Sequence, residues 1–221
     1  MNYLNVRGIS SLVLAITAAV IAAGCSSAPK LVNLGIAKNE VSYYYDSGEY
    51  DKDLLEAVSN AMKDFDKVNV RDSSAIVFDI DETVLSNYPV IKSMDFGYVT
   101  DLWNKWILEA KAPAIDEVKD LYNYLAGRKF HIIFISGRTR AQYDATYKNL
   151  KEAGYATFDT LIVRPDNMLK APAENFKSIE RIVLTNMGYR IEGCVGDQWS
   201  DLKGAYTGIK VKLPNYLYLI N

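Results

Sequence analysis

Short apolar runs alternate with segments of helical periodicity along most of the chain. Five runs are rich in β-branched and aromatic residues and have the length of buried strands: 75–78, 132–135, 161–163, 191–195 and 209–211. Apolar residues recur at helical spacing within four intervening segments: 54–65, 118–125, 143–150 and 175–187. This alternation predicts an α/β fold, with a doubly wound, mainly parallel sheet covered by helices on both faces.

One segment, residues 87–113, leaves this alternation and predicts a small, mostly helical cap inserted into the domain. It is rich in aromatic residues: Tyr88, Phe96, Tyr98, Trp103 and Trp106. Trp103 and Trp106 are spaced to share one face of a helix, which suits packing of the cap onto the domain. The alternative is a wall on which an aromatic leaving group or a nucleobase stacks.

The N-terminal residues predict export rather than a folded element. Arg7 precedes the apolar stretch 9–23, which is short for a membrane span. Residues 21–26, IAAGCS, resemble a bacterial lipobox, so we expect a signal peptide over 1–24, lipidation of Cys25, a tether over 25–40 and a domain over 41–221. By analogy with sorting rules, Ser26 favours the outer membrane. The alternative is an ordinary secretory signal in which Cys25 is incidental.

Charge and cysteine content exclude several classes of protein. The chain has 25 Lys and Arg against 27 Asp and Glu, a formal net charge of −2, so nothing indicates a nucleic-acid partner. Its 2 cysteines cannot form a disulfide framework. Cys194 lies in an apolar run and is expected to be a small buried residue rather than a reactive thiol.

Polar side chains follow three of the predicted strands, where the carboxyl ends of parallel strands meet at one edge of the sheet. They are Asp79, Asp81 and Thr83, then Ser136, Gly137 and Arg138, then Asp197 and Asp201. Asp79 and Asp81 would repel one another without a counter-charge. Oxygen ligands from Asp79 and Asp197, with no His or Cys beside them, favour Mg²⁺ over Zn²⁺.

This set of groups suits phosphoryl transfer. A cation would screen Asp79 from a phosphate dianion, so that Asp79 could attack phosphorus while Asp81 protonates the leaving oxygen and later activates water. Ser136, backbone N–H groups and a lysine would neutralise the phosphoryl oxygens. His131, the single histidine, begins a predicted strand and is expected to be structural rather than catalytic.

The run VFDIDETVLSN, residues 77–87, resembles the D-x-D-x-[TV] signature of the haloacid dehalogenase superfamily. Further segments are similar to its subfamily IIIB acid phosphatases, the branch of the class B and class C lipoprotein enzymes and the plant vegetative storage type: SGR, NLKEAGY, LIVR, FKS, GYRIEG, GDQWSDL and KLPNY. The resemblance implies a Rossmann-like core of that superfamily. Phe176 and Val90 stand where relatives have Tyr, and GDQWSDL follows the plant wording, which leaves subclass and substrate open.

The resemblance also implies residue roles. Asp79 would be the nucleophile, and Asp81 the general acid and base whose backbone carbonyl also meets the metal. Substrate and phosphate would be held by Thr83, Ser136, Gly137, Arg138 and Lys177, and Mg²⁺ by Asp79, Asp81, Asp197 and Asp201. Lys170 is the alternative to Lys177 as the phosphate-binding lysine. Arg138 could contact substrate or pair with an acidic neighbour.

Together these features predict an exported, lipid-anchored, Mg²⁺-dependent acid phosphatase that hydrolyses small organic phosphomonoesters such as nucleotides or aromatic phosphates. Two alternatives stay open. The same fold could transfer the phosphoryl group to an alcohol acceptor, or it could be a non-catalytic surface or storage lipoprotein. A homodimer is compatible with the sequence, which does not specify the oligomeric state.

Overall fold

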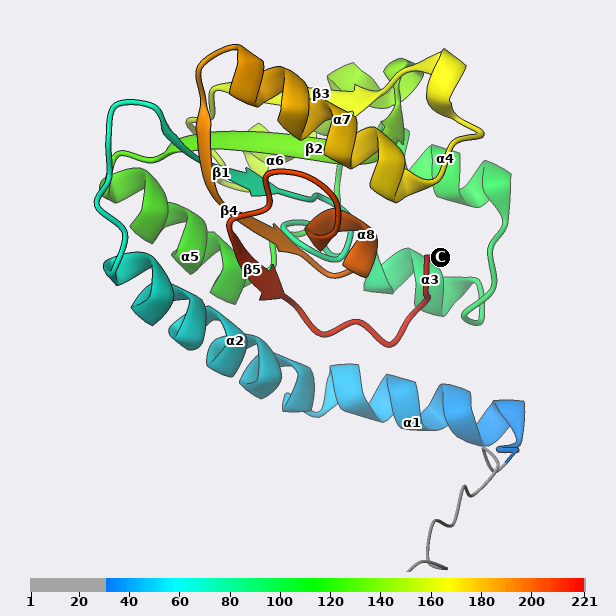
Figure 1. The fold of residues 1–221 in the computed structure, drawn as a ribbon. Coiled ribbons are helices and arrows are strands. Elements are labelled where there is room, and N and C mark those ends of the chain that lie inside the picture. The colour runs from blue at the N-terminus through cyan, green and yellow to red at the C-terminus, as the bar shows by residue number, and fades with distance from the viewer. Residues whose placement is uncertain (1–30, 221) are drawn as a thin grey trace, which may run out of the picture. The chain divides into compact units, whose positions relative to one another are not determined.

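A five-stranded parallel sheet forms the centre of the domain (Figure 1). The computed structural model describes residues 31–220. The sheet has the order β3-β2-β1-β4-β5, with every neighbouring pair parallel. Its strands are β1 (Ser74–Phe78), β2 (His131–Thr139), β3 (Thr160–Arg164), β4 (Arg190–Gly196) and β5 (Ile209–Lys212). Each predicted strand lies inside one of these, so the predicted α/β fold is confirmed.

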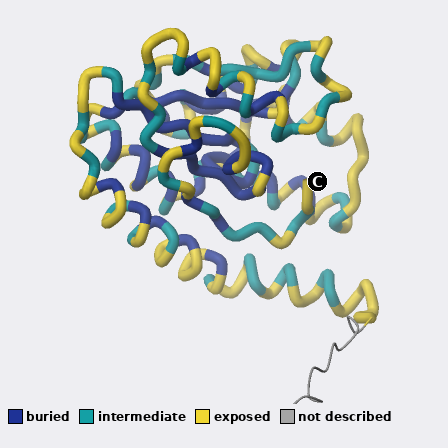
Figure 2. The backbone as a smooth tube through the Cα atoms, viewed as in Figure 1, coloured by how far each residue is buried: buried dark blue, intermediate teal, exposed yellow. Residues whose placement is uncertain are grey.

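Helices cover both faces of the sheet because side chains alternate along each strand. Ile76 and Phe78 of β1 belong to the cluster packed by α2 (Glu49–Asp66), α5 (Asp116–Gly127) and α6 (Tyr143–Glu152). Ala75 and Val77 belong to a second cluster with Phe176 and other residues of α7 (Ala173–Asn186) and α8 (Trp199–Leu202). Figure 2 shows the strands buried between the more exposed helices. Two short 3₁₀ helices complete this part, η1 (Arg140–Gln142) and η2 (Asp166–Met168).

The segment expected to form a cap contains two helices, α3 (Tyr88–Ser93) and α4 (Thr100–Glu109), at the end toward which the strands run (Figure 1). The two tryptophans of α4 differ in their contacts. Trp106 packs against the core, and its Nε1 donates a hydrogen bond to Asn87 Oδ1 at 2.8 Å. Trp103 lies against Tyr98, with ring centroids 5.9 Å apart, and lines the cavity described below.

Residues 34–40, the end of the predicted tether, belong to α1 (Leu34–Asp46). None of the residues of α1 is buried, so its sequence lacks the strong apolar stripe that marks a packed helix. Contacts with distant residues hold it: Tyr44 and Tyr45 pack against the core, and the Tyr45 ring stacks on Tyr88 with centroids 4.7 Å apart. Asp46 accepts hydrogen bonds from Tyr88 Oη at 2.9 Å and Lys92 Nζ at 2.6 Å.

The chain divides into two units, residues 1–34 and residues 35–221. The predicted signal peptide and the lipidation site Cys25 lie outside the described residues. Among residues 31–220, no helix has the length and apolar character needed to cross a membrane.

Candidate active site

A tight turn after β1 presents the first two aspartates. Asp79 N donates to Val195 O at 2.9 Å, which keeps the strand paired with β4 up to that residue. The carbonyl of Ile80 then accepts hydrogen bonds from Val84 N and Leu85 N, both at 3.0 Å, and Glu82 adopts a φ of 57°. The chain therefore reverses within a few residues, so that Asp79 and Asp81 both line the cavity.

Asp79 lies beside a buried lysine and two further aspartates. Lys177 Nζ, from α7, donates to Asp79 Oδ1 and, at 2.6 Å, to Asp201 Oδ1. Because Lys177 is buried and contacts Asp79 while Lys170 is exposed, the geometry favours Lys177 as the phosphate-binding lysine. Burial opposes its charge, but Asp201 and Asp79 raise the pKa of Lys177, which keeps it protonated.

Asp197, at the end of β4, is held by amide side chains. Its Oδ2 accepts hydrogen bonds from Gln198 Nε2 and Asn215 Nδ2, both at 2.6 Å. The hydroxyl of Thr83 lies 3.1 Å from Asp197 Oδ1 and 3.2 Å from Asp79 Oδ2. Thr83 therefore bridges two of the aspartates rather than lining the cavity.

The three carboxylates fit a divalent cation. Asp79, Asp197 and Asp201 each offer an oxygen, and these oxygens lie within 4.8 Å of one another. Burial, together with the neighbouring carboxylates, raises the pKa of Asp79 well above its usual range and that of Asp197 to about 7. Lys177 is the one cation in contact with this group among the described residues, so negative charge is in excess. All-oxygen donors of this kind suit a hard cation.

Asp81 has a different environment, because its carboxylate pairs with Arg138. Arg138 Nη2 lies 2.7 Å from Asp81 Oδ1, and Arg138 Nε lies 3.1 and 3.2 Å from the two oxygens. Asn87 Nδ2 donates to the same Oδ1 at 2.8 Å. Burial opposes ionisation, but Arg138 and Asn87 lower the pKa of Asp81. Arg138 thus pairs with an acidic neighbour, one of the two roles left open for it, and it also lines the cavity.

Ser136 and Gly137 occupy different positions relative to the cavity. Gly137 lines it, whereas Ser136 is fully buried in β2 and is not among the lining residues. Ser136 Oγ accepts a hydrogen bond from Arg138 N at 3.1 Å. In this geometry the Ser136 hydroxyl supports the backbone that carries Arg138.

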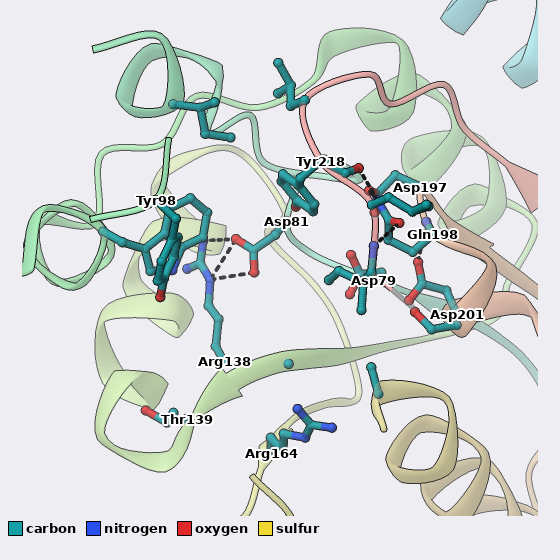
Figure 3. A pocket seen from close by; sticks show the side chains of 18 of the residues that line it. Asp79, Asp81, Tyr98, Arg138, Thr139, Arg164, Asp197, Gln198, Asp201 and Tyr218 are labelled. Atoms are coloured by element: carbon teal, nitrogen blue, oxygen red, sulfur yellow. Dashed lines mark hydrogen bonds and ion pairs between the residues drawn. The ribbon is translucent and has the colours of Figure 1, made fainter. Parts of the chain in front are cut away.

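The cavity has a volume of about 710 Å³ and opens over the aspartates (Figure 3). In Figure 3, Arg138 reaches toward Asp81, while Asp79, Asp197 and Asp201 gather on the other side. The cap contributes an apolar wall of Ile91, Met94, Phe96, Tyr98 and Trp103, and the C-terminal segment contributes Leu217, Tyr218, Leu219 and Ile220. The cavity size is within the range of small-molecule sites.

Sequence reasoning missed a buried network beside Asp81. Glu82 Oε1 accepts from Asn87 N at 2.6 Å, and Glu82 Oε2 accepts from Tyr218 Oη. Burial, with Asp81 nearby, raises the pKa of Glu82 to about 7. Tyr218 is separated from Glu82 by 136 positions, so no local pattern reveals their contact. For Asn215 the sequence did offer an indication, since this residue belongs to the KLPNY segment that is similar to the acid phosphatases.

Two residues expected to be structural, His131 and Cys194, are not among the residues that line the cavity. His131 Nδ1 lies 2.5 Å from Asp159 Oδ1, and neither residue lines the cavity. Asp159 raises the pKa of His131. Cys194 is buried within β4, and burial raises the pKa of its thiol to about 12, which keeps the thiol protonated.

Comparison with known proteins gives the family. Residues 17–221 match the family described as HAD superfamily, subfamily IIIB (acid phosphatase). A stem 28 kDa glycoprotein of Glycine max is 41% identical over 159 residues, which cover 69% of this chain and 63% of that protein. Acid phosphatase 1 of Solanum lycopersicum is 34% identical over 148 residues, 65% of this chain and 58% of that protein.

The fold agrees with these matches. The structure of a class C acid phosphatase from Bacillus anthracis with tungstate bound has a TM-score of 0.68, with 24% identity, covering 84% of this chain and 85% of that chain. The matched regions span 53–63% of the length of the three Glycine max relatives. By the match over residues 17–221, the chain belongs to subfamily IIIB of the HAD superfamily, the acid phosphatases.

Proposed function

We propose that this chain is a metal-dependent phosphomonoesterase that forms a transient aspartyl-phosphate on Asp79. One observation carries the proposal: Asp79 lies at the carboxyl end of β1, in contact with Lys177, grouped with Asp197 and Asp201, and open to a cavity of about 710 Å³. A buried carboxylate with one cationic neighbour and two acidic ones has no evident structural use.

The reaction has two displacements. In the first, an Asp79 carboxylate oxygen forms a bond to phosphorus as the bond from phosphorus to the leaving oxygen breaks, and Asp81 gives that oxygen a proton. In the second, the oxygen of water forms a bond to phosphorus as the bond from phosphorus to the Asp79 oxygen breaks, and the water loses a proton to Asp81. This step frees the Asp79 carboxylate and releases inorganic phosphate. Lys177 donates to the phosphoryl oxygens and offsets their charge.

Arg138 links substrate binding to the protonation of Asp81. In the free site the guanidinium lowers the pKa of Asp81, which holds that carboxyl ionised. A phosphoryl dianion that accepts hydrogen bonds from Arg138 would weaken this pairing and raise the pKa of Asp81. Substrate binding thereby favours the protonated form that a general acid requires.

The metal we propose is Mg²⁺, held by Asp79, Asp197 and Asp201, with the Asp81 backbone carbonyl as the family resemblance implies. When bound, it would neutralise the clustered carboxylates and polarise a phosphoryl oxygen. The oxygen-only donor set of the described residues supports this choice.

The cap supports small aromatic phosphomonoesters or nucleotides as substrates. Tyr98 and Trp103 line the cavity and contact each other, which provides a surface for stacking. Transfer to an alcohol instead of water would use the same aspartyl-phosphate, and is distinguished by measuring free phosphate against phosphorylated acceptor.

A non-catalytic storage role is the second candidate, favoured by one observation. Vegetative storage protein 1 of Arabidopsis thaliana is 33% identical over 185 residues, 80% of this chain and 65% of that protein. A purely storage role leaves the Asp79 and Asp81 pair without a use. Absence of activity over a broad panel of phosphomonoesters, with folded and Mg²⁺-loaded protein, would support storage.

The test is Asp79→Asn, assayed with p-nitrophenyl phosphate in Mg²⁺ and in EDTA. We expect the variant to lose at least about three orders of magnitude in kcat, since the nucleophile is gone. Asp144→Asn is the matched control, because Asp144 is exposed and this substitution makes the same change of charge. Full turnover by Asp79→Asn, or full wild-type turnover in EDTA, would contradict the proposal.

We further propose that the protein is exported and anchored to the bacterial envelope through lipid on Cys25. This proposal rests only on the lipobox-like sequence of residues 21–26. Palmitate labelling of the full chain tests this, with Cys25→Ser as the unlabelled variant. Equal labelling of both would contradict it.

A further inference from the structure

Within residues 31–220, three cationic side chains line the cavity, and two of them already have acidic partners. Lys177 contacts Asp79 and Asp201, and Arg138 pairs with Asp81. The third, Arg164, has no carboxylate within ion-pairing distance among residues 31–220. It is therefore the cation of the cavity whose charge is left uncompensated by this part of the chain.

Arg164 lies at the same edge of the sheet as the aspartates. It is the last residue of β3, paired in register with Thr139 of β2. β3 is separated from β1 by β2 alone, so its backbone lies roughly 10 Å from that of β1 at the spacing of adjacent strands. Figure 3 shows the Arg164 side chain on the side of the cavity away from Asp197 and Tyr218.

The surroundings of the guanidinium leave donors unused. Arg164 Nη2 donates to Ala171 O, and its Cζ lies 5.9 Å from the centroid of the Phe176 ring. Arg164 Nε is buried without a hydrogen-bond partner, the one such side-chain atom among the described residues. Burial lowers the pKa of Arg164, and no acidic neighbour offsets that effect. An unpaired buried donor is costly, so the guanidinium has donor capacity that the described residues leave unused.

We propose that Arg164 binds a second anionic group of the substrate, separate from the phosphoryl group that reacts at Asp79. The inference rests on the proposed phosphomonoesterase function and narrows its substrates to organic phosphates that carry another phosphate or a carboxylate across a spacer. A guanidinium binds either group through charge-assisted, often paired hydrogen bonds. The volume of about 710 Å³ accommodates such a molecule.

A purely structural role for Arg164 has to be separated from this one. The bond to Ala171 O ties β3 to the residues before α7, but it uses one of several N–H donors of the guanidinium. If holding this segment were its whole role, replacing Arg164 would lower activity toward every phosphomonoester alike. Only anion binding makes the loss depend on the second charge of the substrate.

The experiment compares matched substrates on the full-length protein. One pair is adenosine 5′-monophosphate and adenosine 3′,5′-bisphosphate, and the other is phenyl phosphate and 4-carboxyphenyl phosphate. We expect the wild type to favour at least one doubly anionic member about tenfold or more in kcat/KM, equal to about 1.4 kcal/mol. The pair that shows the preference identifies phosphate or carboxylate as the second group.

Arg164→Gln keeps an amide donor for Ala171 O while removing the charge, and should abolish this preference with less than about a twofold change for the substrates whose one anionic group is the reacting phosphate. Lys170→Ala is the matched control, because Lys170 lies exposed between β3 and α7 and this substitution also removes one positive charge. Arg164→Lys should retain part of the preference. Calorimetric binding of each substrate runs in parallel on every variant.

No preference in the wild type, an equal loss for both members of a pair in Arg164→Gln, or the same loss in Lys170→Ala would overturn the inference. Failure of the proposed function looks different. In that case neither substrate is hydrolysed, yet tighter binding of the doubly anionic member by wild type than by Arg164→Gln would still support the anion site.

Discussion

Removing divalent cations should make the stability of this domain fall as the pH rises. Burial raises the pKa of Asp79, that of Asp197 to about 7 and that of Glu82 to about 7. Each therefore has a folded-state pKa above its unfolded value, so the native state binds more protons between the two values. In EDTA, the free energy of unfolding should decrease from about pH 4.5 to about pH 7.

The magnitude follows from proton linkage. Each extra proton bound by the native state changes the free energy of unfolding by about 1.4 kcal/mol per pH unit. Asp197 and Glu82 together set a slope of up to roughly 2.7 kcal/mol per unit near pH 6, when both are protonated in the native state alone. His131, whose pKa Asp159 raises, adds in the same direction. Such a slope is large against a typical total of about 5–15 kcal/mol.

Urea unfolding followed by tryptophan fluorescence, in EDTA at several pH values, measures this slope. Asp197→Asn should reduce the slope by the contribution of one proton, about 1.4 kcal/mol per pH unit. The variant should also unfold at a higher urea concentration than the wild type near neutral pH, because one of the crowded negative charges is gone. Asp144→Asn, at an exposed position, should follow the wild type. Saturating Mg²⁺ should restore stability, by about 2.7 kcal/mol at one hundred times Kd. A slope that is flat or rises with pH in EDTA would refute the reasoning.

Three further outcomes follow from the contacts around the site. Asn87→Ala removes a hydrogen bond to Asp81, so kcat should fall about tenfold for alkyl phosphates. For p-nitrophenyl phosphate kcat should fall less than about twofold, because its leaving group needs little protonation. Equal losses of kcat across a series of leaving groups would contradict this. Lys177→Met should lower the EDTA unfolding free energy by about 3–5 kcal/mol, because buried carboxylates lose their cation, and urea melts measure it. Trp103→Ala should raise KM for aromatic but not alkyl phosphates, whereas Trp106→Phe should cost about 1 kcal/mol of stability with KM unchanged.

The sheet could be predicted from sequence because burial determines it. All five residues of β1 are buried and four of them, 75–78, are apolar, so the run has the pattern of a central strand. Helix α1 gave no comparable signal, since none of its residues is buried and contacts such as Lys92 to Asp46 join distant positions. Local patterns report burial well and long-range polar contacts poorly.

The aspartates of the site could be placed for a related reason, as Asp79 and Asp197 directly follow adjacent parallel strands. The partners of Asp81 could not be foreseen fully. Arg138 was a candidate, but Asn87 and the Glu82 contact of Tyr218 depend on how the cap and the C-terminal segment fold back over the turn.

The most direct measurement is a crystal structure of the protein with Mg²⁺ and beryllium fluoride. If Asp79 is the nucleophile, we expect continuous electron density from its carboxylate oxygen to beryllium, with Lys177 within hydrogen-bond distance of a fluoride. Beryllium fluoride joined to another side chain, or an unmodified Asp79 in a well-ordered, Mg²⁺-loaded site, would contradict a phosphoryl group carried by this residue.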